Sequence, residues 1–582
     1  MSVVTTTDAA PDRRHSAEST ATRVLVYGLS AALAFIAVVM ALRPYSAGMT
    51  DTFAFGGDWL WQQALFQVHG QAGPLGTTDH LAYPEGMSGW RLPQMGLLTG
   101  VFAWVTVGWL GVPSSAAVIW FVAVCAALNA AGIVFLLRSV LRTRWPVLTG
   151  VVAVTIGASI WVTSHQINLA LFLVLPVTFA VIHRWDNGLL DRPRYWVLGL
   201  FVLALVSPLW WVVVLVLLLP VAVLPALVRR DWQRSGHTLW VWGALLLGML
   251  GQAALFLTLG KGPGNDTTRQ AWASNYSGGH LVDLAVGSPA AVEYLPRIGL
   301  LTEGASPDSG WGFTSCLAAA IALLAVLAVP PIRSRVGGTT VFLAGATVAV
   351  TLFWFMGGLG NLQAGAAVLL GAVSPARAWN RMLLPLALLG AMWGFVLLRR
   401  WLADSPSPAV QRVTLGLLTL GLSAMFVADH VVNPTRPYQL VTSPALPMTT
   451  FLSDTKEPCP VAQLPNETVP VERIKTTAFK DPLKYTAYAP YTQLPDFYWS
   501  GGSYAPGQDP ATHPVNAVPV ALDAASLDQL AQAGFCAVTY SVAQAQLAQA
   551  QDVEIEGRDL AQDLPTPSWQ DDTYKVWLLP TP

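Results

Sequence analysis

The sequence predicts a polytopic α-helical membrane protein with a C-terminal α/β domain outside the bilayer. Hydrophobic residues make up 53% of the 582 residues and charged residues only 11%, whereas soluble domains carry about 25% charged residues. Apolar runs of roughly 20 residues, the length that crosses a bilayer core, recur through the first three quarters of the chain. After residue 430 the composition shifts to Pro, Asp, Thr and Gln. The net charge of −1 argues against a nucleic-acid partner, because no basic segment is present to neutralise phosphates.

Arginine clusters orient the predicted spans, because short cytoplasmic loops collect Lys and Arg. The clusters are Arg138, Arg142 and Arg144; Arg184, Arg192 and Arg194; Arg229, Arg230 and Arg234; Arg333 and Arg335; and Arg399 and Arg400. About eleven transmembrane helices, with the N-terminus inside and the C-terminus outside, place every cluster in the cytoplasm. The apolar stretch 93–111 is then a re-entrant or interfacial segment, because a full crossing there would place the next three clusters outside. The predicted spans are 24–42, 115–137, 146–164, 169–184, 194–208, 209–228, 238–260, 311–329, 339–357, 379–398 and 410–428. We therefore expect a multi-pass protein of the plasma membrane.

Three regions follow from these spans. Residues 1–22 are polar and are expected to form a disordered cytoplasmic tail, and residues 23–430 form the transmembrane domain. The outer loops of that domain are 43–92, 261–310 and 358–378.

Residues 431–582 are expected to form the extracytoplasmic α/β domain. Two short apolar stretches, "CPVAQL" and "FCAVTYS", read as strands, and "AASLDQLAQA" reads as an amphipathic helix. Cys459 and Cys536 lie in this region, where a disulfide can form if the region is outside the cytoplasm. The aromatic-rich stretch "KYTAYAPYTQLPDFYWSGGSYAPG" either binds a glycan chain or packs as a loop on the small domain.

The first outer loop mixes acids with aromatic residues. Its polar residues are Asp51, Asp58, Asp79, His80, Glu85 and Arg91, interleaved with Trp59, Trp61, Tyr83 and Trp90. Carboxylates accept sugar hydroxyl protons and aromatic faces stack on sugar rings, so the mixture predicts a carbohydrate site at the membrane surface. The alternative is an interfacial aromatic belt with ordinary loop acids. Asp58 stands apart, because the glycines of "FGGDWLWQQ" allow close backbone approach.

Two polar residues stand at the outer end of the third predicted span, in "SHQINLALFLVLP". His165 and Asn168 lie one helical turn apart there. They are either substrate-binding groups on the same side as the acids or a helix-end histidine bonded to a carbonyl.

Cationic residues also occur in the other outer segments. Lys261 and Arg269 lie in the second outer loop, and Arg377 and Arg381 share one helix face at the end of the third. Paired arginines on the outside run against the charge asymmetry of the rest of the chain. They favour an anionic partner such as a phosphate, which Arg binds in bidentate fashion, or else anionic lipid headgroups.

Several short stretches carry a resemblance to a known family. They are "GGDWLWQQ", "TTDHLAYPEGMS", "SHQINLALFLVLP", "YSGGHLVDLAVGSP" and "SPARAWNRM", with "CPVAQLPNE" and "GFCAVTYS" near the C-terminus. In this layout the chain resembles the GT-C superfamily of integral-membrane glycosyltransferases, and in particular bacterial proteins related to the YfhO family. The resemblance implies a polyprenyl-phosphate-linked sugar donor and a catalytic acid in the first outer loop, which carries over to Asp58, with Asp79 as the second acid. Where relatives often have Gly-His-Asn, this chain has Ser164, His165 and Gln166.

The chemistry of such a reaction agrees with these residues. A polyprenyl phosphate is a good leaving group, so the enzyme must deprotonate the acceptor hydroxyl and stabilise the phosphate. The hypothesis makes Asp58 the general base of an inverting transfer to a cell-envelope glycan, lipid or protein acceptor. The expected substrate-binding residues are Asp79, His80, Glu85, His165, Asn168, Lys261, Arg269, Arg377 and Arg381, with Lys261, Arg377 and Arg381 on the lipid phosphate and Asp79, His80 and His165 on the sugar or acceptor.

No cofactor is required by this hypothesis. A divalent cation would find oxygen ligands in Asp51, Asp58, Asp79 and Glu85, although their spacing does not demand one. The alternatives to a glycosyltransferase are a lipid or glycan transporter or flippase, and a non-catalytic envelope-assembly scaffold. Transporters usually carry ionisable residues at mid-membrane, whereas the predicted spans here are almost free of charge.

Overall fold

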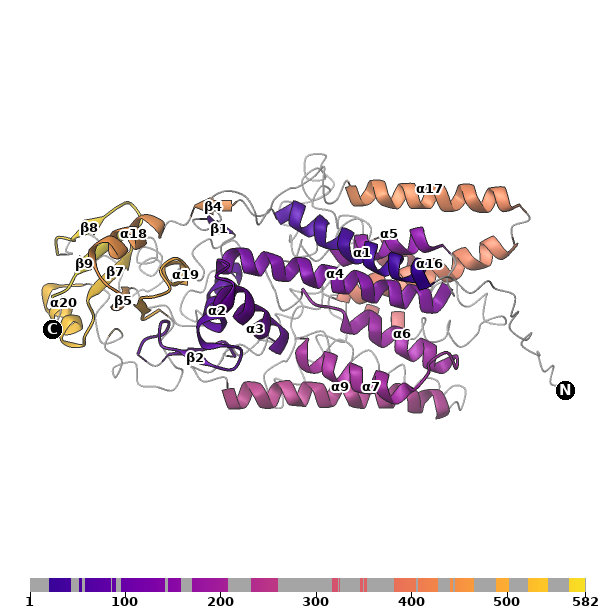
Figure 1. Ribbon diagram of the computed structural model, residues 1–582, viewed down its shortest axis with the longest axis horizontal. Helices are drawn as coiled ribbons and strands as arrows, with labels where there is room; N and C mark the ends of the chain where they lie inside the picture. Colours follow the sequence, from indigo (N-terminus) through magenta and orange to yellow (C-terminus); the bar gives the residue numbers. More distant parts are fainter. Residues whose placement is uncertain are drawn as a thin grey trace.

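A computed structural model describes most of the helical region and parts of the C-terminal region. The described residues are 20–42, 52–54, 58–84, 86–90, 96–141, 145–158, 170–207, 232–259, 317–322, 324, 346–348, 350–352, 382–404, 407–427, 440–442, 445–464, 488–501, 515, 522–542 and 565–580. Helices gather at one end of the molecule and a β-sheet lies at the other, with the short helix α2 (Asp58–Ala72) between them (Figure 1).

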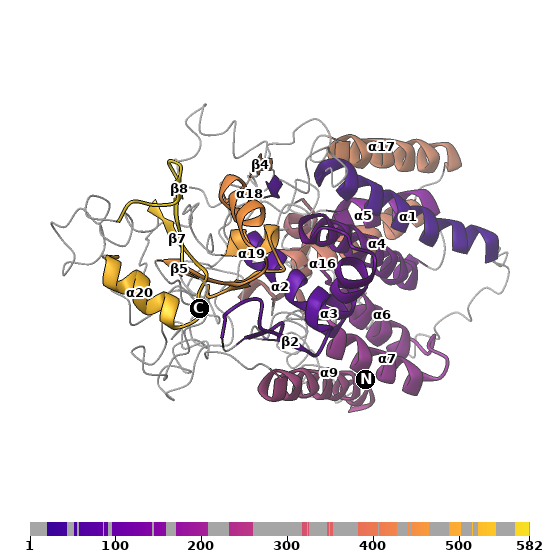
Figure 2. The same cartoon turned by 60° about the vertical axis from the view of Figure 1, so that its left-hand side comes forward.

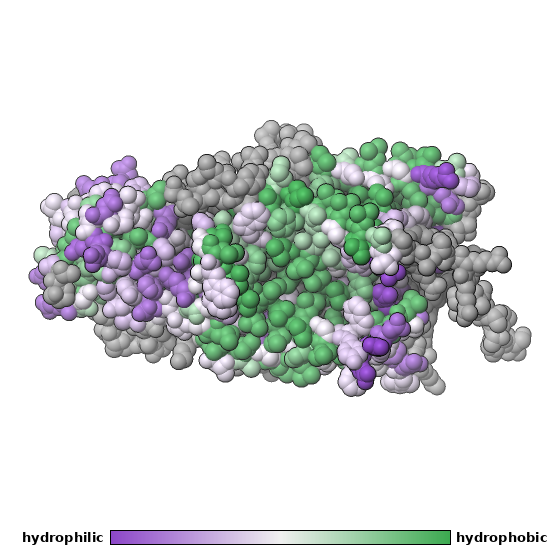
Figure 3. Space-filling model, viewed as in Figure 1, coloured by the Kyte–Doolittle hydropathy of each residue, from purple (hydrophilic) through white to green (hydrophobic). Residues whose placement is uncertain are grey.

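Four of the described helices are long and apolar enough to cross a bilayer. They are α1 (Thr20–Leu42), α4 (Ser114–Leu141), α9 (Trp232–Leu259) and α17 (Pro408–Val427). At about 1.5 Å per residue they span about 30 to 42 Å, against a hydrocarbon core of about 30 Å. Their exposed side chains are largely apolar, and Figure 3 shows a hydrophobic band over the middle of the molecule. The chain is a membrane protein, and the predicted number of crossings and their orientation stay predictions.

Helix α4 is the centre of the bundle. It packs against α1, α5 (Pro146–Ala158), α6 (Val174–Asp186) and α16 (Leu383–Asp404). Gly157 of α5 lies against the backbone of Ala130, so the two helices approach closely, as small residues permit in membranes. Helix α17 packs against α5 at the edge of the bundle and has no buried residue.

Helix ends follow local sequence. Proline opens α5, α17 and α7 (Pro193–Val206), where its missing N–H leaves no helical bond unmade. Helix α1 begins at Thr20, so residues 20–22, which we expected in the tail, belong to the helix.

The stretch 93–111 holds α3 (Leu97–Ala103) and the π-helix η1 (Trp104–Trp109), which together reach only about 20 Å and pack along α2.

Helices α5, α6 and α7 are each shorter than the bilayer core, and the described backbone just before α6 is irregular. Helix α6 begins at Val174, whereas the sequence predicted a span from 169. The segment before it is held by Asn129 of α4: its Nδ2 donates to the Ala170 carbonyl at 2.7 Å, and its Oδ1 accepts from Phe172 N at 3.0 Å. Irregular backbone inside a membrane requires such partners, because lipid provides none.

The end of α7 meets the same segment. Ser207 Oγ donates to the carbonyl of Leu171 at 3.1 Å. Helix α9 satisfies the last turn of α7, because Gln252 Nε2 donates to the Leu205 carbonyl at 2.9 Å. Side chains from three helices therefore complete the hydrogen bonds of one buried, irregular junction.

The C-terminal region contains a five-stranded sheet in the order β6-β5-β7-β9-β8. Its strands are β5 (Pro460–Leu464), β6 (Tyr498–Trp499), β7 (Ala537–Ser541), β8 (Trp569–Gln570) and β9 (Tyr574–Leu578). Strand β5 pairs in parallel with β6 and β7, and β9 pairs antiparallel with β7 and β8. The two strands and the helix that the sequence predicted here are β5, β7 and α20 (Ala524–Gln532).

The two faces of this sheet bury different cores, because alternate residues of a strand point to opposite faces. Val461 and Ala537 join the large core that continues into the bundle. Their neighbours Ala462 and Val538 join a separate core with Leu530 of α20. Figure 2 shows α20 on one side of the sheet and α19 (Ala489–Gln493) and α2 on the other.

A disulfide joins Cys459, next to β5, to Cys536, next to β7. These are the two cysteines that the sequence places in the C-terminal region. Helix α18 (Leu446–Thr455) precedes this crosslink and covers the sheet near β8 and β9.

Candidate functional site

The start of α2 is built by pairing between distant parts of the chain. Strand β1 (Thr52–Ala54) pairs antiparallel with β4 (Leu440–Thr442), so the approach to α2 lies beside the approach to the C-terminal sheet. Asp58 is the first residue of α2. The turns that follow are almost fully buried, from Leu60 and Trp61 through Phe66. These buried turns pack α2 between the bundle and the sheet, and Asp58 begins the helix there.

After α2 the chain forms a small hairpin that carries Asp79 and His80. Its strands are β2 (Thr77–Thr78) and β3 (Met87–Ser88). Leu81, at the tip, forms a parallel bridge with Trp499 of β6. Trp499 N donates to the His80 carbonyl at 3.0 Å, and Tyr83 N donates to the Trp499 carbonyl at 3.0 Å. The hairpin therefore adds a short strand to the free edge of the C-terminal sheet, as peptides do in β-augmentation.

Ala82 sits between these two hydrogen bonds in a left-handed conformation, with φ +59°. Residues other than glycine rarely adopt it, and it costs about 1 kcal/mol. The bonds on both sides hold the residue there.

The His80 ring has neighbours at one face and at both of its nitrogens. The ring stacks on Tyr498 with centroids 4.4 Å apart and planes at 13°. Its Nδ1 lies 3.2 Å from the Asp496 carbonyl and must donate to it, because a carbonyl only accepts. Its Nε2 lies 4.0 Å from Asp79 Oδ1. His80 thus faces the C-terminal sheet, and the 66% exposed Asp79 is the member of the pair that is open to a ligand.

Gln71, near the end of α2, connects the same parts through its side-chain amide. Its Nε2 donates to the Pro495 carbonyl at 2.7 Å, and its Oε1 accepts from Tyr491 Oη at 2.7 Å and from Thr78 Oγ1 at 3.2 Å. Burial raises the pKa of Tyr491 well above its ordinary value, so this hydroxyl stays a donor. No pattern in the sequence pointed to Gln71.

The aromatic-rich stretch packs against the loop in its described part, residues 488–501. Tyr488, Tyr491, Phe497 and Trp499 are at most 2% exposed. Tyr488 contacts Trp61 of α2 with ring centroids 4.7 Å apart. Of the two interpretations left open by the sequence, packing describes these four rings, because a buried ring cannot stack on a glycan.

His69 is a buried histidine of α2 that the sequence did not single out. Its Nδ1 lies 3.3 Å from the Gly73 carbonyl, and its ring is enclosed by Gly89 and Gly100, where a Cβ would crowd it. Burial lowers the pKa of His69 from its usual 6.5 to about 4. The ring is therefore neutral at physiological pH.

Most of the predicted substrate-binding residues lie outside the described part of the chain. They are Glu85, His165, Asn168, Lys261, Arg269, Arg377 and Arg381, together with the suggested metal ligand Asp51. Their roles stay predictions. Among the side chains that the structure describes, no three His, Cys, Asp or Glu groups are placed to hold a metal ion.

The chain is similar in structure to two solved transferases. The Archaeoglobus fulgidus oligosaccharyltransferase in complex with zinc and sulfate matches with TM-score 0.44 and 10% identity, over 91% of this chain and 70% of that chain. Its apo form matches with TM-score 0.44 and 11% identity, over 90% and 70%. The arabinofuranosyltransferase AftD from Mycobacteria matches with TM-score 0.44 and 14% identity, over 90% of this chain but only 37% of that chain.

A comparison with protein-family models and one with curated proteins found no match.

Proposed function

We propose that this protein is a membrane glycosyltransferase of the GT-C type, of the kind related to the YfhO family. It moves a sugar from a polyprenyl-phosphate donor to a cell-envelope glycan, lipid or protein on the extracytoplasmic side. Asp58 is the general base, and the anomeric centre inverts in a single displacement. About eleven crossings and an extracytoplasmic C-terminal domain belong to the same proposal.

The observation that supports this most is the position of Asp58 in the fold. It begins a buried helix at the boundary between the apolar bundle and the C-terminal sheet (Figure 1). A base for a lipid-linked substrate has to lie at that boundary, because the lipid chain stays in the bilayer and the acceptor arrives from water. The hairpin and Gln71 hold the other end of α2 against the sheet. A fixed position of the helix that carries the base is important, because a misplacement of a catalytic group by about 1 Å lowers the rate about 100-fold.

The other predicted residues take supporting roles in this proposal. Lys261, Arg377 and Arg381 stabilise the departing phosphate, and Arg269, Glu85, His165 and Asn168 bind donor or acceptor. Asp79 orients the acceptor with His80 beside it, since the His80 ring is fixed on Tyr498.

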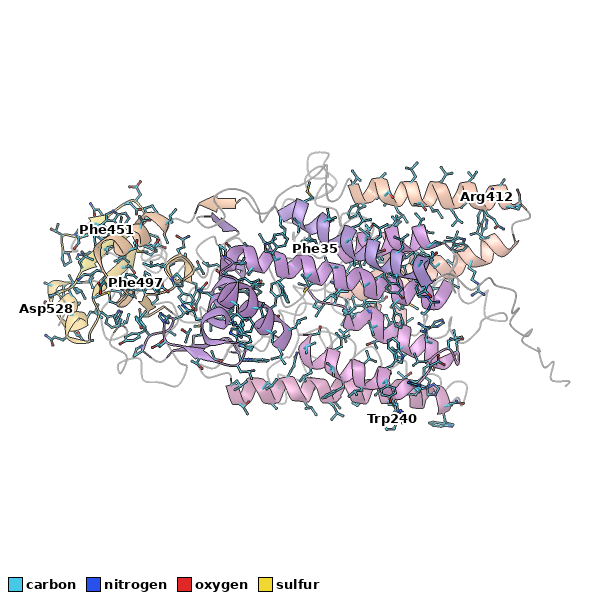
Figure 4. The ribbon with its side chains drawn as sticks, in the orientation of Figure 1. Phe35, Trp240, Arg412, Phe451, Phe497 and Asp528 are labelled. Carbon is cyan, nitrogen blue, oxygen red and sulfur yellow. A yellow bond between two sulfur atoms is a disulfide. The ribbon has the colours of Figure 1, made fainter. Side chains whose placement is uncertain are left out.

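The test is replacement of Asp58 by Asn in cells that lack the native protein. We expect loss of transfer by about 100-fold or more, the range of general-base catalysis. The readout is mass spectrometry of envelope glycans and of accumulated polyprenyl-phosphate sugars. The matched control is Asp528→Asn, an exposed acid on α20 at the far side of the sheet (Figure 4), which should leave transfer unchanged.

The outcomes separate the alternatives. Full activity of the Asp58→Asn variant would contradict the assignment of the base. A scaffold is indicated if deletion of the protein alters the glycans while the Asp58→Asn variant restores them. An unchanged glycan profile in cells without the protein would contradict a glycosyltransferase.

Transport is the second candidate, and one observation favours it. The irregular segment held by Asn129 and Ser207 inside the bundle resembles the broken helices of transporters. A transporter would move a labelled polyprenyl-phosphate sugar across proteoliposomes in both the wild-type and Asp58→Asn forms. The proposed transferase would show no such movement.

A further inference from the structure

Three arginines from three helices gather at the end of the bundle farthest from the C-terminal sheet. Arg23 lies in the first turns of α1, Arg138 in the last turn of α4 and Arg184 in the last turn of α6. Helix α1 begins at this end of the molecule, where α4 and α6 finish (Figure 1).

Aromatic rings hold these guanidinium groups by their faces. Arg138 Cζ lies 5.8 Å from the centroid of the Tyr27 ring of α1. Arg184 Cζ lies 5.1 Å from the centroid of Phe135, which stacks on Trp196 at 5.0 Å. Arg23 lies four residues before Tyr27 on α1, about one helical turn away. Positive charge thus converges around Tyr27 from several helices.

One of these guanidinium groups, that of Arg184, keeps a hydrogen-bond donor without an acceptor among the described residues. A guanidinium over a ring interacts through its face, while its N–H groups point outward in its plane. The Nε of Arg184 is buried and has no hydrogen-bond partner among the described residues. The neighbouring acid Asp186 is bonded to His237 Nδ1 at 3.1 Å. Within the described part of the chain, no acid pairs with Arg23 or Arg184. A buried donor of a charged group is costly to leave without an acceptor, and an anion is the acceptor that also balances its charge.

A place for an apolar tail lies next to the cluster. Val24 and Leu25, the two residues after Arg23 in α1, are 65% and 63% exposed. A cavity of about 600 Å³ runs between α1, α5 and α17, lined along α1 from Thr22 to Ala41. Its lining is largely apolar, with four hydroxyl side chains, and its first lining residue on α1, Thr22, is the sequence neighbour of Arg23. An anion that carries a hydrocarbon chain fits arginines next to an apolar cavity better than a free ion does.

We propose that Arg23, Arg138 and Arg184 bind the phosphate of an anionic phospholipid in the leaflet at this end of the bundle. The site is separate from the proposed transfer site at α2 and does not depend on it. Guanidinium groups bind phosphate oxygens through paired N–H donors. Basic pockets between transmembrane helices are a known mode of headgroup binding.

The experiment is native mass spectrometry of the full-length protein in detergent, with equal amounts of phosphatidylglycerol and phosphatidylcholine of the same acyl chains. The wild type should retain phosphatidylglycerol preferentially. Each guanidinium near a lipid phosphate contributes about 1 kcal/mol, so Arg184→Gln should lower that preference about five-fold. Arg138→Gln, on another helix, should lower it by a similar factor.

The matched control is Arg412→Gln, an exposed arginine at the start of α17 at the same end of the molecule (Figure 4), which should leave the preference unchanged. Thermal unfolding in detergent identifies a misfolded variant. If one arginine variant is misfolded, the lipid preference of the other variant tests the proposal. Equal retention of the two lipids by the wild type would overturn the proposal. So would an unchanged preference in a folded Arg184→Gln or Arg138→Gln protein. Displacement of the lipid by millimolar inorganic phosphate alone would overturn the lipid assignment.

Discussion

Two side-chain amides join distant parts of this chain, one outside the helical bundle and one within it. Gln71 donates to Pro495 and accepts from Tyr491, and it is exposed at the edge of the C-terminal sheet. Asn129 donates to the Ala170 carbonyl and accepts from Phe172 N, and it is completely buried in α4. Each amide uses its donor and its acceptor to bridge segments that local sequence does not bring together.

The difference between them is what replaces the amide if it is removed. Water can reach the partners of Gln71, so their hydrogen bonds are exchanged and the net loss is small. No water is available to Ala170 and Phe172 at the centre of the bundle, and an unpaired backbone group there costs the full desolvation penalty. The same functional group is therefore a minor contributor at one site and a major one at the other.

The largest expected effect tests the buried amide. Asn129→Leu should destabilise the protein by about 4 kcal/mol, because it leaves one carbonyl and one N–H unpaired. Thermal unfolding of the protein in detergent measures this. Asn187→Ala is the matched control: Asn187 is an exposed asparagine just after α6 that donates to the His183 carbonyl at 2.6 Å, and its loss should cost less than 1 kcal/mol. Equal shifts in the two variants would break the comparison.

The second prediction concerns His69, which lies two residues before Gln71 but is buried. Its pKa of about 4 in the fold lies below the usual 6.5. Between these values the unfolded chain takes up a proton on His69 and the folded chain does not. Stability is therefore fully present above pH 6.5 and is lost as the pH falls toward 4, by up to about 3 kcal/mol.

Unfolding curves between pH 7 and pH 4 measure this pH-dependent loss of stability. His69→Gln should flatten the slope, because glutamine does not titrate. A slope that is unchanged in a folded His69→Gln protein would assign the acid sensitivity to other groups.

The smallest expected effect tests the exposed amide. Gln71→Ala should lower stability by about 1 kcal/mol, since water replaces its partners. Gln67→Ala, one turn earlier on α2, is the matched control and should have no effect beyond helix propensity. Proteolysis of the C-terminal region should become faster in the Gln71→Ala variant, because α2 loses a tie to Pro495. A loss as large as that of Asn129→Leu would contradict the role assigned to solvent.

The fold was predictable where its signal is local. Runs of apolar residues predicted α1, α4, α9 and α17, and two short apolar stretches predicted β5 and β7. Helix ends were less accurate: α6 begins five residues after the predicted start of its span. The reason is that Asn129 satisfies the non-helical backbone before it, so the chain need not be helical there.

The candidate site was predictable in part. Aromatic and acidic residues around Asp58 and Asp79 marked the first outer loop, but the partner of His80 could not be foreseen. His80 is fixed by Tyr498 and Asp496 rather than left open to solvent. A histidine in a loop carries no local mark of such a contact.

By itself, the sequence determined that this is a membrane protein with a polar, aromatic first loop and a C-terminal region of different composition. Those properties depend on composition and on the spacing of apolar residues, which are local quantities. Only the tertiary structure decided that Gln71 meets Tyr491, 420 residues away, and that the hairpin at Leu81 extends the C-terminal sheet. Such pairs form because packing brings two surfaces together and buried polar groups must then find partners, and neither requirement leaves a trace in neighbouring residues.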